Sequence, residues 1–270
     1  MNPRSASFDR GRLARALICV LLICAIASPP GAFARPALSG LPCLISQDPS
    51  PRRQARPKSA APSRSSAADA AFLEDLSRRA FSYFWEKTDP DTGLVLDRAR
   101  TDGSVHDEAH SNIASLAATG FGLTGLCIAS EHGWVTRDEA RKRALASLRF
   151  FAERAPHEHG WFYHWMDWKT GARQWNSEVS SIDTALFLAG VLTVKQCFRE
   201  NAEIVRLATR IYRRVDFRWM LNGHPTLLSH GWKPETGFLK SRWDTYSEHT
   251  ILNLLAIGSP TRPTPPAAWR

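Results

Sequence analysis

Residues 173–198 read RQWNSEVSSIDTALFLAGVLTVKQCF, in which a polar loop gives way to an apolar helix. Ser180 stands three residues before Asp183, at the point where the apolar run begins. A Ser-x-x-Asp pair in this place is typical of a capping box, because both side chains accept hydrogen bonds from backbone N–H groups that the helix leaves free. The stretch therefore predicts a helix that starts at residue 180, with Glu178 in the loop just before it.

Five other segments have the composition of helices that pack against a core. Thr136 and Glu139 open one of them in capping-box register, and the glycines of AATGFGLTG in another indicate close helix packing. No long run with strand periodicity competes with them, so we expect an all-α fold. The five segments are residues 69–88, 111–133, 136–155, 201–221 and 246–258.

Three connections between the expected helices contain a Thr-Gly pair after charged residues or proline. They read TDPDTGLVLDR, WMDWKTGARQW and WKPETGFLKSRW, with the glycines at 93, 171 and 237. Glycine accepts a positive φ at no steric cost, so each pair predicts a tight turn or short hairpin. Helix pairs joined in a weak repeat predict a toroid of αα-hairpins with its hairpin loops at one end. A closed toroid of this kind needs about twelve helices, so we expect half of one here.

The N-terminal region has the pattern of an export signal. Four arginines precede the apolar run ALICVLLICAIAS, and the small residues Ala32 and Ala34 follow at cleavage-site spacing. We expect a signal peptide over residues 1–34, a disordered linker rich in Pro, Ser and Arg over 35–68, and the folded domain over 69–270. The protein is then secreted or periplasmic; the alternative is a membrane anchor formed by an uncleaved leader.

The positive charge of the chain lies mostly outside the expected domain. Residues 1–68 hold ten Lys and Arg against two Asp and Glu, which is +8 of the net +9. The domain is close to neutral, so the composition does not predict a nucleic-acid partner. Cys127 and Cys197 lie in apolar segments and are expected to be buried thiols. The histidines form no HExxH pair, and we expect no metal and no cofactor.

Five blocks follow one another between Phe72 and Pro263. They read FLEDLSRRAFSYFWEKTDPDTGLVLDR, AATGFGLTGLCIASEHGWVTRDEA, SSIDTALFLAGVLTVKQCF, RLATRIYRRVDFRWML and WDTYSEHTILNLLAIGSPTRP. Together they resemble the bacterial glucoamylase-like domain family, which includes the endo-β-1,2-glucanases of glycoside hydrolase family 144. The resemblance implies an (α/α)6 barrel, export, and hydrolysis of glucan linkages by carboxylates in a cleft at one end. Members of the family continue past the Gly-Ser-Pro-Thr block at 258–261, so we expect a C-terminally truncated chain that holds the N-terminal half of the barrel.

The catalytic candidates are Asp183 and Glu178. Glycoside cleavage needs one carboxylic acid to protonate the leaving oxygen and a second group to activate water or attack carbon. Asp183 matches the position of an acidic residue in the family, and Glu178 lies close enough to face the same cleft. The alternative is that Asp183 only caps its helix and Glu178 is a solvated loop charge. We expect the helix dipole to lower the pKa of Asp183, which favours a role as a base.

Aromatic rings and polar groups around the carboxylates are candidates for holding sugar rings. The loop HWMDWKTGARQW has more tryptophans than a core hairpin requires, and RWDTYSEH combines aromatic residues with a carboxylate. The predicted substrate-binding residues are Asp97, Arg98, Trp175, Trp243, Tyr246 and Glu248. For Asp97 and Arg98 the alternative is an exposed ion pair. For Glu248 the alternative is an acid in the first turn of a helix.

The function expected from these features is that of a secreted glycoside hydrolase which cleaves a β-glucan of the β-1,2-linked kind. Its partner is then a polysaccharide or oligosaccharide, with no nucleic acid and no membrane after signal cleavage. The alternative is a truncated, inactive fragment that binds glycan or has no function. A half-toroid leaves apolar helix faces uncovered, so we also expect self-association.

Overall fold

The computed structural model describes residues 66–104 and 106–269. By its contacts the chain divides into two units, Met1–Phe72 and Leu73–Arg270. The described residues of the first unit form the start of helix α2 (Ala67–Glu86). There the side chain of Ser66 accepts from the N–H of Asp69, and the side chain of Asp69 accepts from the N–H of Ser66. The helix starts two residues before the predicted domain boundary. The predicted signal peptide and the linker up to residue 65 lie outside the described residues.

All six predicted helices occur in the described residues, with shifted ends. The first residues of segment 111–133 form a strand, and residues 246–249 are not helical. Segment 201–221 is divided at Val215, where the backbone is extended and Asp216 caps a new short helix. The helices after α2 are α3 (Leu116–His132), α4 (Arg137–Glu153), α5 (Ser181–Cys197), α6 (Ala202–Arg214), α7 (Phe217–Met220) and α8 (Thr250–Ile257), followed by the 3-10 turn η1 (Pro266–Trp269).

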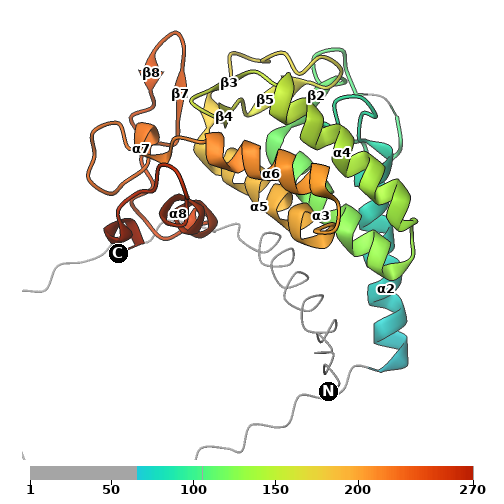
Figure 1. Cartoon of the computed structure of the whole chain (residues 1–270). Coiled ribbons are helices and arrows are strands. Elements are labelled where there is room, and N and C mark those ends of the chain that lie inside the picture. Colours follow the sequence, from blue (N-terminus) through green and yellow to red (C-terminus); the bar gives the residue numbers. More distant parts are fainter. Residues whose placement is uncertain (1–65, 105, 270) are drawn as a thin grey trace, which may run out of the picture. The chain divides into compact units, whose positions relative to one another are not determined.

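Helices α3 and α5 form the centre of the second unit. Helix α4 packs on α3 and α6, and α5 packs on α3, α6 and α8 (Figure 1). The approach of α3 and α5 is closest at two glycines, since a Cβ atom added to Gly190 would lie 2.1 Å from the carbonyl oxygen of Gly120. The close packing predicted from AATGFGLTG is therefore confirmed at Gly120.

Short strands connect the helices and gather at one end of them, at the top of Figure 1. Two of the strands run directly into the central helices: β2 ends at Ser115, which caps α3, and β6 ends at Ser180, which caps α5. The described strands pair antiparallel in three sheets of order β1-β2-β5, β3-β4 and β6-β7-β8. Their bounds are β1 Val95–Leu96, β2 Ile113–Ser115, β3 His157–Glu158, β4 Trp161–Phe162, β5 Trp165–Asp167, β6 Val179–Ser180, β7 Gly231–Lys233 and β8 Gly237–Phe238.

The three Thr-Gly turns have the predicted backbone conformation. The φ angles are 68° at Gly93, 75° at Gly171 and 77° at Gly237. In the first two turns an aspartate Oδ1, of Asp89 or Asp167, accepts hydrogen bonds from two following N–H groups and from the threonine hydroxyl. Local side-chain acceptors thus fix these turns.

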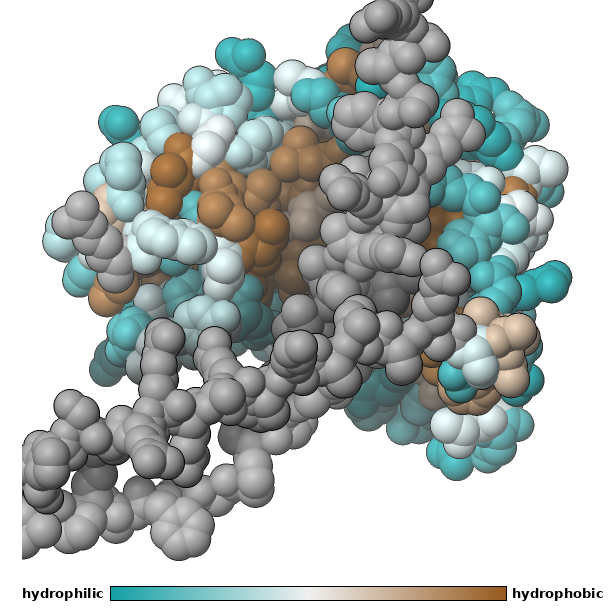
Figure 2. Space-filling view, turned by 90° about the horizontal axis from the view of Figure 1, so that it is seen from below, coloured by the Kyte–Doolittle hydropathy of each residue, from teal (hydrophilic) through white to brown (hydrophobic). Residues whose placement is uncertain are grey.

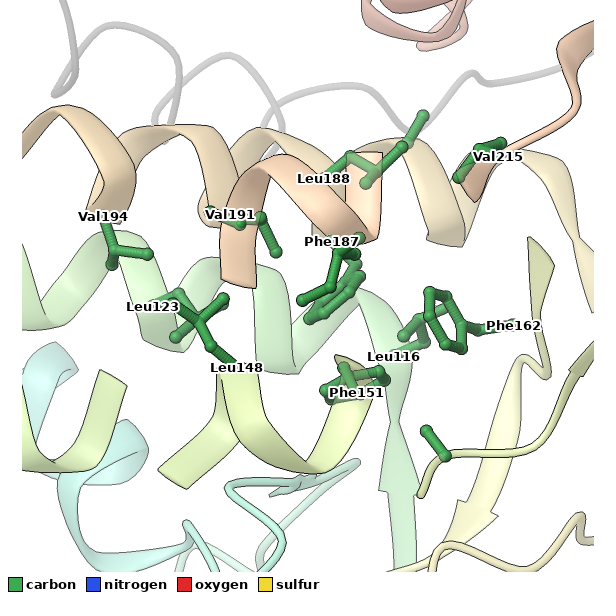
Figure 3. Packing of buried hydrophobic residues seen from close by; sticks show 14 of the residues in the cluster. Leu116, Leu123, Leu148, Phe151, Phe162, Phe187, Leu188, Val191, Val194 and Val215 are labelled. Carbon is green, nitrogen blue, oxygen red and sulfur yellow. The ribbon is translucent and has the colours of Figure 1, made fainter. Parts of the chain in front are cut away.

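Leucine, valine and phenylalanine side chains fill the core between α3, α4 and α5 (Figure 3). The rings of Phe151 and Phe187 lie 4.0 Å apart, and Phe162 meets both edge-on. The predicted burial is confirmed for Cys127, whereas Cys197 is partly exposed at the end of α5. Within the described ranges, no helix combines the length and hydrophobicity needed to cross a bilayer.

Replacing Gly190 by Ala is expected to destabilise the protein by about 2 to 3 kcal/mol, because the added methyl group meets backbone rather than a movable side chain. Gly125→Ala in α3 is the matched control. Its Cβ would lie 3.4 Å from the Phe81 ring, and alanine favours the helix, so stability should be unchanged or slightly higher. Urea unfolding of both variants measures the difference; equal midpoints would contradict the close approach of α3 and α5.

Candidate functional site

The two predicted catalytic carboxylates meet the same imidazole ring at the start of α5. His164, between β4 and β5, lies with Nδ1 3.0 Å from Glu178 Oε1. Its Nε2 lies 3.6 Å from Asp183 Oδ1. The structure therefore brings Glu178 and Asp183 together through His164, and we call these three residues the Glu178–His164–Asp183 cluster.

The backbone and a neighbouring ring fix His164 in place. The backbone N–H of His164 donates to the backbone carbonyl of Glu178 at 3.0 Å. The backbone carbonyl of His164 accepts from the N–H of Leu116, the first residue of α3, at 3.2 Å. Its ring stacks on Trp165 with centroids 4.0 Å apart and an interplanar angle of 17°. The imidazole therefore has a defined position at the point where both central helices begin.

Of the predicted Ser180–Asp183 capping box, the serine half is present, whereas Asp183 accepts from the Ser180 hydroxyl group instead of a backbone N–H. Ser180 Oγ accepts from the N–H of Asp183 at 3.2 Å and donates to its Oδ2 at 2.5 Å. Helix α3 starts in the same manner, because Ser115 Oγ accepts from the N–H of Ala118 at 3.2 Å. In α3 the N–H that the serine caps belongs to Ala118, which has no carboxylate. The serine cap of α5 therefore does not require the carboxylate of Asp183.

The environment shifts the pKa values of the two carboxyl groups in opposite directions. Burial raises the pKa of Asp183. The hydrogen bond from His164 lowers the pKa of Glu178. Burial alone would lower the pKa of His164, but the hydrogen bond to Glu178 and the negative charge of Asp183 raise it. The expectation that the helix dipole lowers the pKa of Asp183 was wrong, because desolvation outweighs the dipole.

Asp97 and Arg98 lie on the loop after β1. The charge of Asp97 contributes to the raised pKa of His164. Arg98 Nε lies 2.5 Å from Asp97 Oδ2, and the arginine side chain is 48% exposed. The ion pair considered as an alternative is present, and it leaves the arginine side chain partly open to solvent.

Trp175 extends the aromatic surface that begins at His164 and Trp165. It is 43% exposed and lies edge-on to Trp165, with ring centroids 5.6 Å apart. Trp175 and Asn176 have φ angles of 52° and 48°, which non-glycine residues adopt rarely and mostly where the surroundings enforce them. The backbone thus holds a half-exposed indole ring against Trp165, whose ring stacks on His164.

Trp243 lies beside the start of α5, whereas Tyr246 and Glu248 do not reach the cluster. The indole N–H of Trp243 donates to Ser181 Oγ at 2.9 Å, and its ring stacks on His230 at 4.0 Å. Tyr246 is 95% exposed, and Glu248 is exposed as well. Helix α8 begins only after them, so Glu248 is not a first-turn helix acid.

The cluster does not form a metal site. In residues 66–104 and 106–269, no group of three or more His, Cys, Asp or Glu side chains is placed to hold a metal ion. The two ring nitrogens of His164 face different carboxylates, so the three side chains do not converge on one point as metal ligands do.

Known proteins similar to this chain are glucan hydrolases and glucoamylase-like proteins. No family model matches the chain. An exo-β-1,2-glucooligosaccharide sophorohydrolase of Parabacteroides distasonis is 24% identical over 204 residues, which is 71% of this chain and 27% of that protein. An endo-β-1,2-glucanase of Chitinophaga pinensis, solved with sophorotriose and glucose, is 28% identical with a TM-score of 0.63, over 74% of this chain and 49% of its own. A protein assigned as a glucoamylase in Bacteroides caccae is 31% identical with a TM-score of 0.65, over 74% of this chain and 50% of its own.

Fold and comparisons together define a helical protein of the glucoamylase-like α/α-toroid class, as predicted. The chain spans about half the length of the solved relatives. Within that class, the resemblance to the bacterial glucoamylase-like domain family, which includes the endo-β-1,2-glucanases of glycoside hydrolase family 144, is confirmed.

Asp183→Asn is expected to leave the free energy of unfolding unchanged at about pH 7 or to raise it by about 1 kcal/mol. A carboxyl group whose pKa is raised by folding stabilises the fold while it is protonated, and this contribution is lost as pH rises from the unfolded to the folded pKa. Asparagine stays neutral throughout. Ser180→Ala, in contrast, should lower the free energy of unfolding by about 1 kcal/mol, since it removes the cap. Urea unfolding followed by circular dichroism measures both; an Asp183→Asn variant as unstable as Ser180→Ala would mean that the carboxylate serves the cap.

Proposed function

We propose that this chain forms half of a glycoside hydrolase that cleaves a β-glucan, of the β-1,2-linked kind. The observation that carries the proposal is the Glu178–His164–Asp183 cluster beside an exposed indole ring, at the end of the helices where the strands gather. Two carboxyl groups with pKa values pushed apart are the usual arrangement for a proton donor and an anion in one site. The activities of the Parabacteroides and Chitinophaga relatives support the choice of substrate.

Asp183 is the proton donor in this proposal. Its burial keeps the carboxyl group protonated to higher pH, as a general acid requires. The ring of His164 lies between the two carboxylates and leaves no place there for a glycosidic bond. Glu178 remains ionised in this proposal, and it acts on Asp183 through its hydrogen bond to the imidazole. The group that activates water then lies across the sugar ring from Asp183.

The substrate is a polysaccharide or oligosaccharide in the same proposal. Trp175 offers an exposed ring face for stacking on a sugar, and Trp165 continues this surface toward the carboxylates. The guanidinium of Arg98 and the carboxylate of Asp97 are placed to hydrogen-bond sugar hydroxyl groups. Export through the N-terminal leader, to the periplasm or the medium, belongs to the proposal as well.

Incubation with β-1,2-glucan and detection of released oligosaccharides tests the hydrolase. We expect Asp183→Asn to lower the rate by roughly 100-fold or more, the usual share of a general acid. Asp138→Asn is the matched control, because Asp138 is an exposed acid in the first turn of α4. Wild-type chain that releases nothing from several β-glucans would refute hydrolysis by this chain. Glycan binding without turnover would then support the second candidate, an inactive glycan-binding fragment, which the exposed Trp175 surface favours.

Self-association through the apolar helix faces is a further part of the proposal. Hydrophobic residues gather on the face seen in Figure 2. Phe121 on α3 and Leu186 on α5 are partly exposed, and Leu254 on α8 is 53% exposed. Contiguous apolar surface of this kind marks an interface in soluble proteins.

Light scattering of the wild-type chain should therefore show species larger than a monomer. Leu254→Glu is expected to shift the distribution toward monomer, because association would bury the new charge. Leu73→Glu, at a similarly exposed leucine on α2, is the matched control and should change the distribution less. A wild-type chain that stays monomeric at high concentration would contradict self-association.

A further inference from the structure

His164 and His230 occupy equivalent places at the starts of the two central helices, α3 and α5. The carbonyl of His164 accepts from the first N–H of α3, on Leu116, and the carbonyl of His230 accepts from the first N–H of α5, on Ser181. Each imidazole also stacks on a tryptophan with centroids 4.0 Å apart, at 17° for His164 and 21° for His230. A histidine stacked on an indole at a helix start is thus a repeated element of the scaffold.

Only one of the two rings is enclosed by carboxylates in the part of the chain that the structure describes. His164 meets Glu178 at Nδ1 and Asp183 at Nε2, and the charge of Asp97 also acts on it. Among the neighbouring cations, Arg98 pairs with Asp97, and the charges of Lys233 on β7 and of Arg173 act on Glu178. The ring of His230 has no carboxylate contact among the described residues and lies instead near His249. The acidic surroundings of His164 are therefore an addition to the scaffold.

We propose that His164 is a positioning residue of the active site, whose imidazolium ion is fixed by Glu178 and presents Nε2–H to Asp183. Glu178 sets the ring orientation through the 3.0 Å hydrogen bond to Nδ1, and Trp165 holds the ring plane. At 3.6 Å the contact to Asp183 is electrostatic rather than a hydrogen bond. When Asp183 gives up its proton to the leaving oxygen, the positive ring stabilises the carboxylate that remains.

The catalytic meaning of this inference rests on the proposed function, but the positioning itself does not. An NMR titration of the histidine ring nitrogens in the full chain reports the protonation of His164 without any substrate. In the wild type we expect the ring to stay protonated to higher pH than an exposed histidine, and Glu178→Gln should shift its titration to lower pH.

Kinetics on β-1,2-glucan give the second readout. Asparagine at position 164 keeps a donor near the place of Nδ1 but removes the charge at Nε2. His164→Asn should therefore lower kcat roughly 100-fold, change KM by less than about threefold, and shift the alkaline limb of the pH–rate profile to higher pH, because Asp183 loses a neighbouring positive charge. His230→Asn is the matched control, because it removes the same stacked ring elsewhere and should leave the shape of the pH–rate profile unchanged.

Two results would overturn the inference: a His164 titration that does not respond to Glu178→Gln, or equal shifts of the pH–rate profile in His164→Asn and His230→Asn. A titration that responds to Glu178→Gln in a chain that cleaves no β-glucan supports the positioning of His164 and refutes the proposed function. The two readouts thus separate failure of the inference from failure of the function.

Discussion

The contact between Gly120 on α3 and Gly190 on α5 is the constraint on which the rest of the structure depends. A Cβ atom on Gly190 would lie 2.1 Å from the Gly120 carbonyl, and one on Gly120 would lie 2.6 Å from the Phe187 Cα. Backbone packed this closely cannot slide without clashes, so the two helices share one register. Both helices consequently begin beside His164, which bonds the first residue of α3 and the loop before α5.

Helices α3 and α5 start with the same pattern of side-chain hydrogen bonds, but only α5 carries a carboxylate there. In each helix a threonine four residues after the capping serine accepts a hydrogen bond from a backbone N–H outside the helix, Thr119 from Val95 and Thr184 from Phe162. The residues between the shared serine and threonine differ, and the third residue after the cap is Ala118 in α3 and Asp183 in α5. Because α3 makes the same serine cap and threonine contact without a carboxylate, these contacts do not account for Asp183.

Local features of the sequence were sufficient to predict the helices, the Thr136–Glu139 capping box and the conformation of the Thr-Gly turns, since neighbouring residues determine each of them. Strands of two or three residues such as β2 and β6 are too short to show a periodicity. His164 was missed because its partners lie 14 and 19 residues away and meet it only through tertiary packing. The direction of the Asp183 pKa shift depends on burial, which the pattern of residues does not reveal.

The balance of effects at Asp183 explains why the pKa values of the two carboxyl groups shift in opposite directions. A helix N-terminus stabilises a carboxylate by about 0.3 to 1 kcal/mol near the surface, and the 3.6 Å contact to His164 adds a further attraction. Desolvation of a buried carboxylate opposes both effects, and it dominates here. Glu178 is less buried and accepts a direct hydrogen bond from the imidazole, so it carries the negative charge. Because burial raises the pKa of Asp183 while the imidazole lowers that of Glu178, a substitution that exposes Asp183 to water would remove the cause of its raised pKa and leave all three functional groups in place.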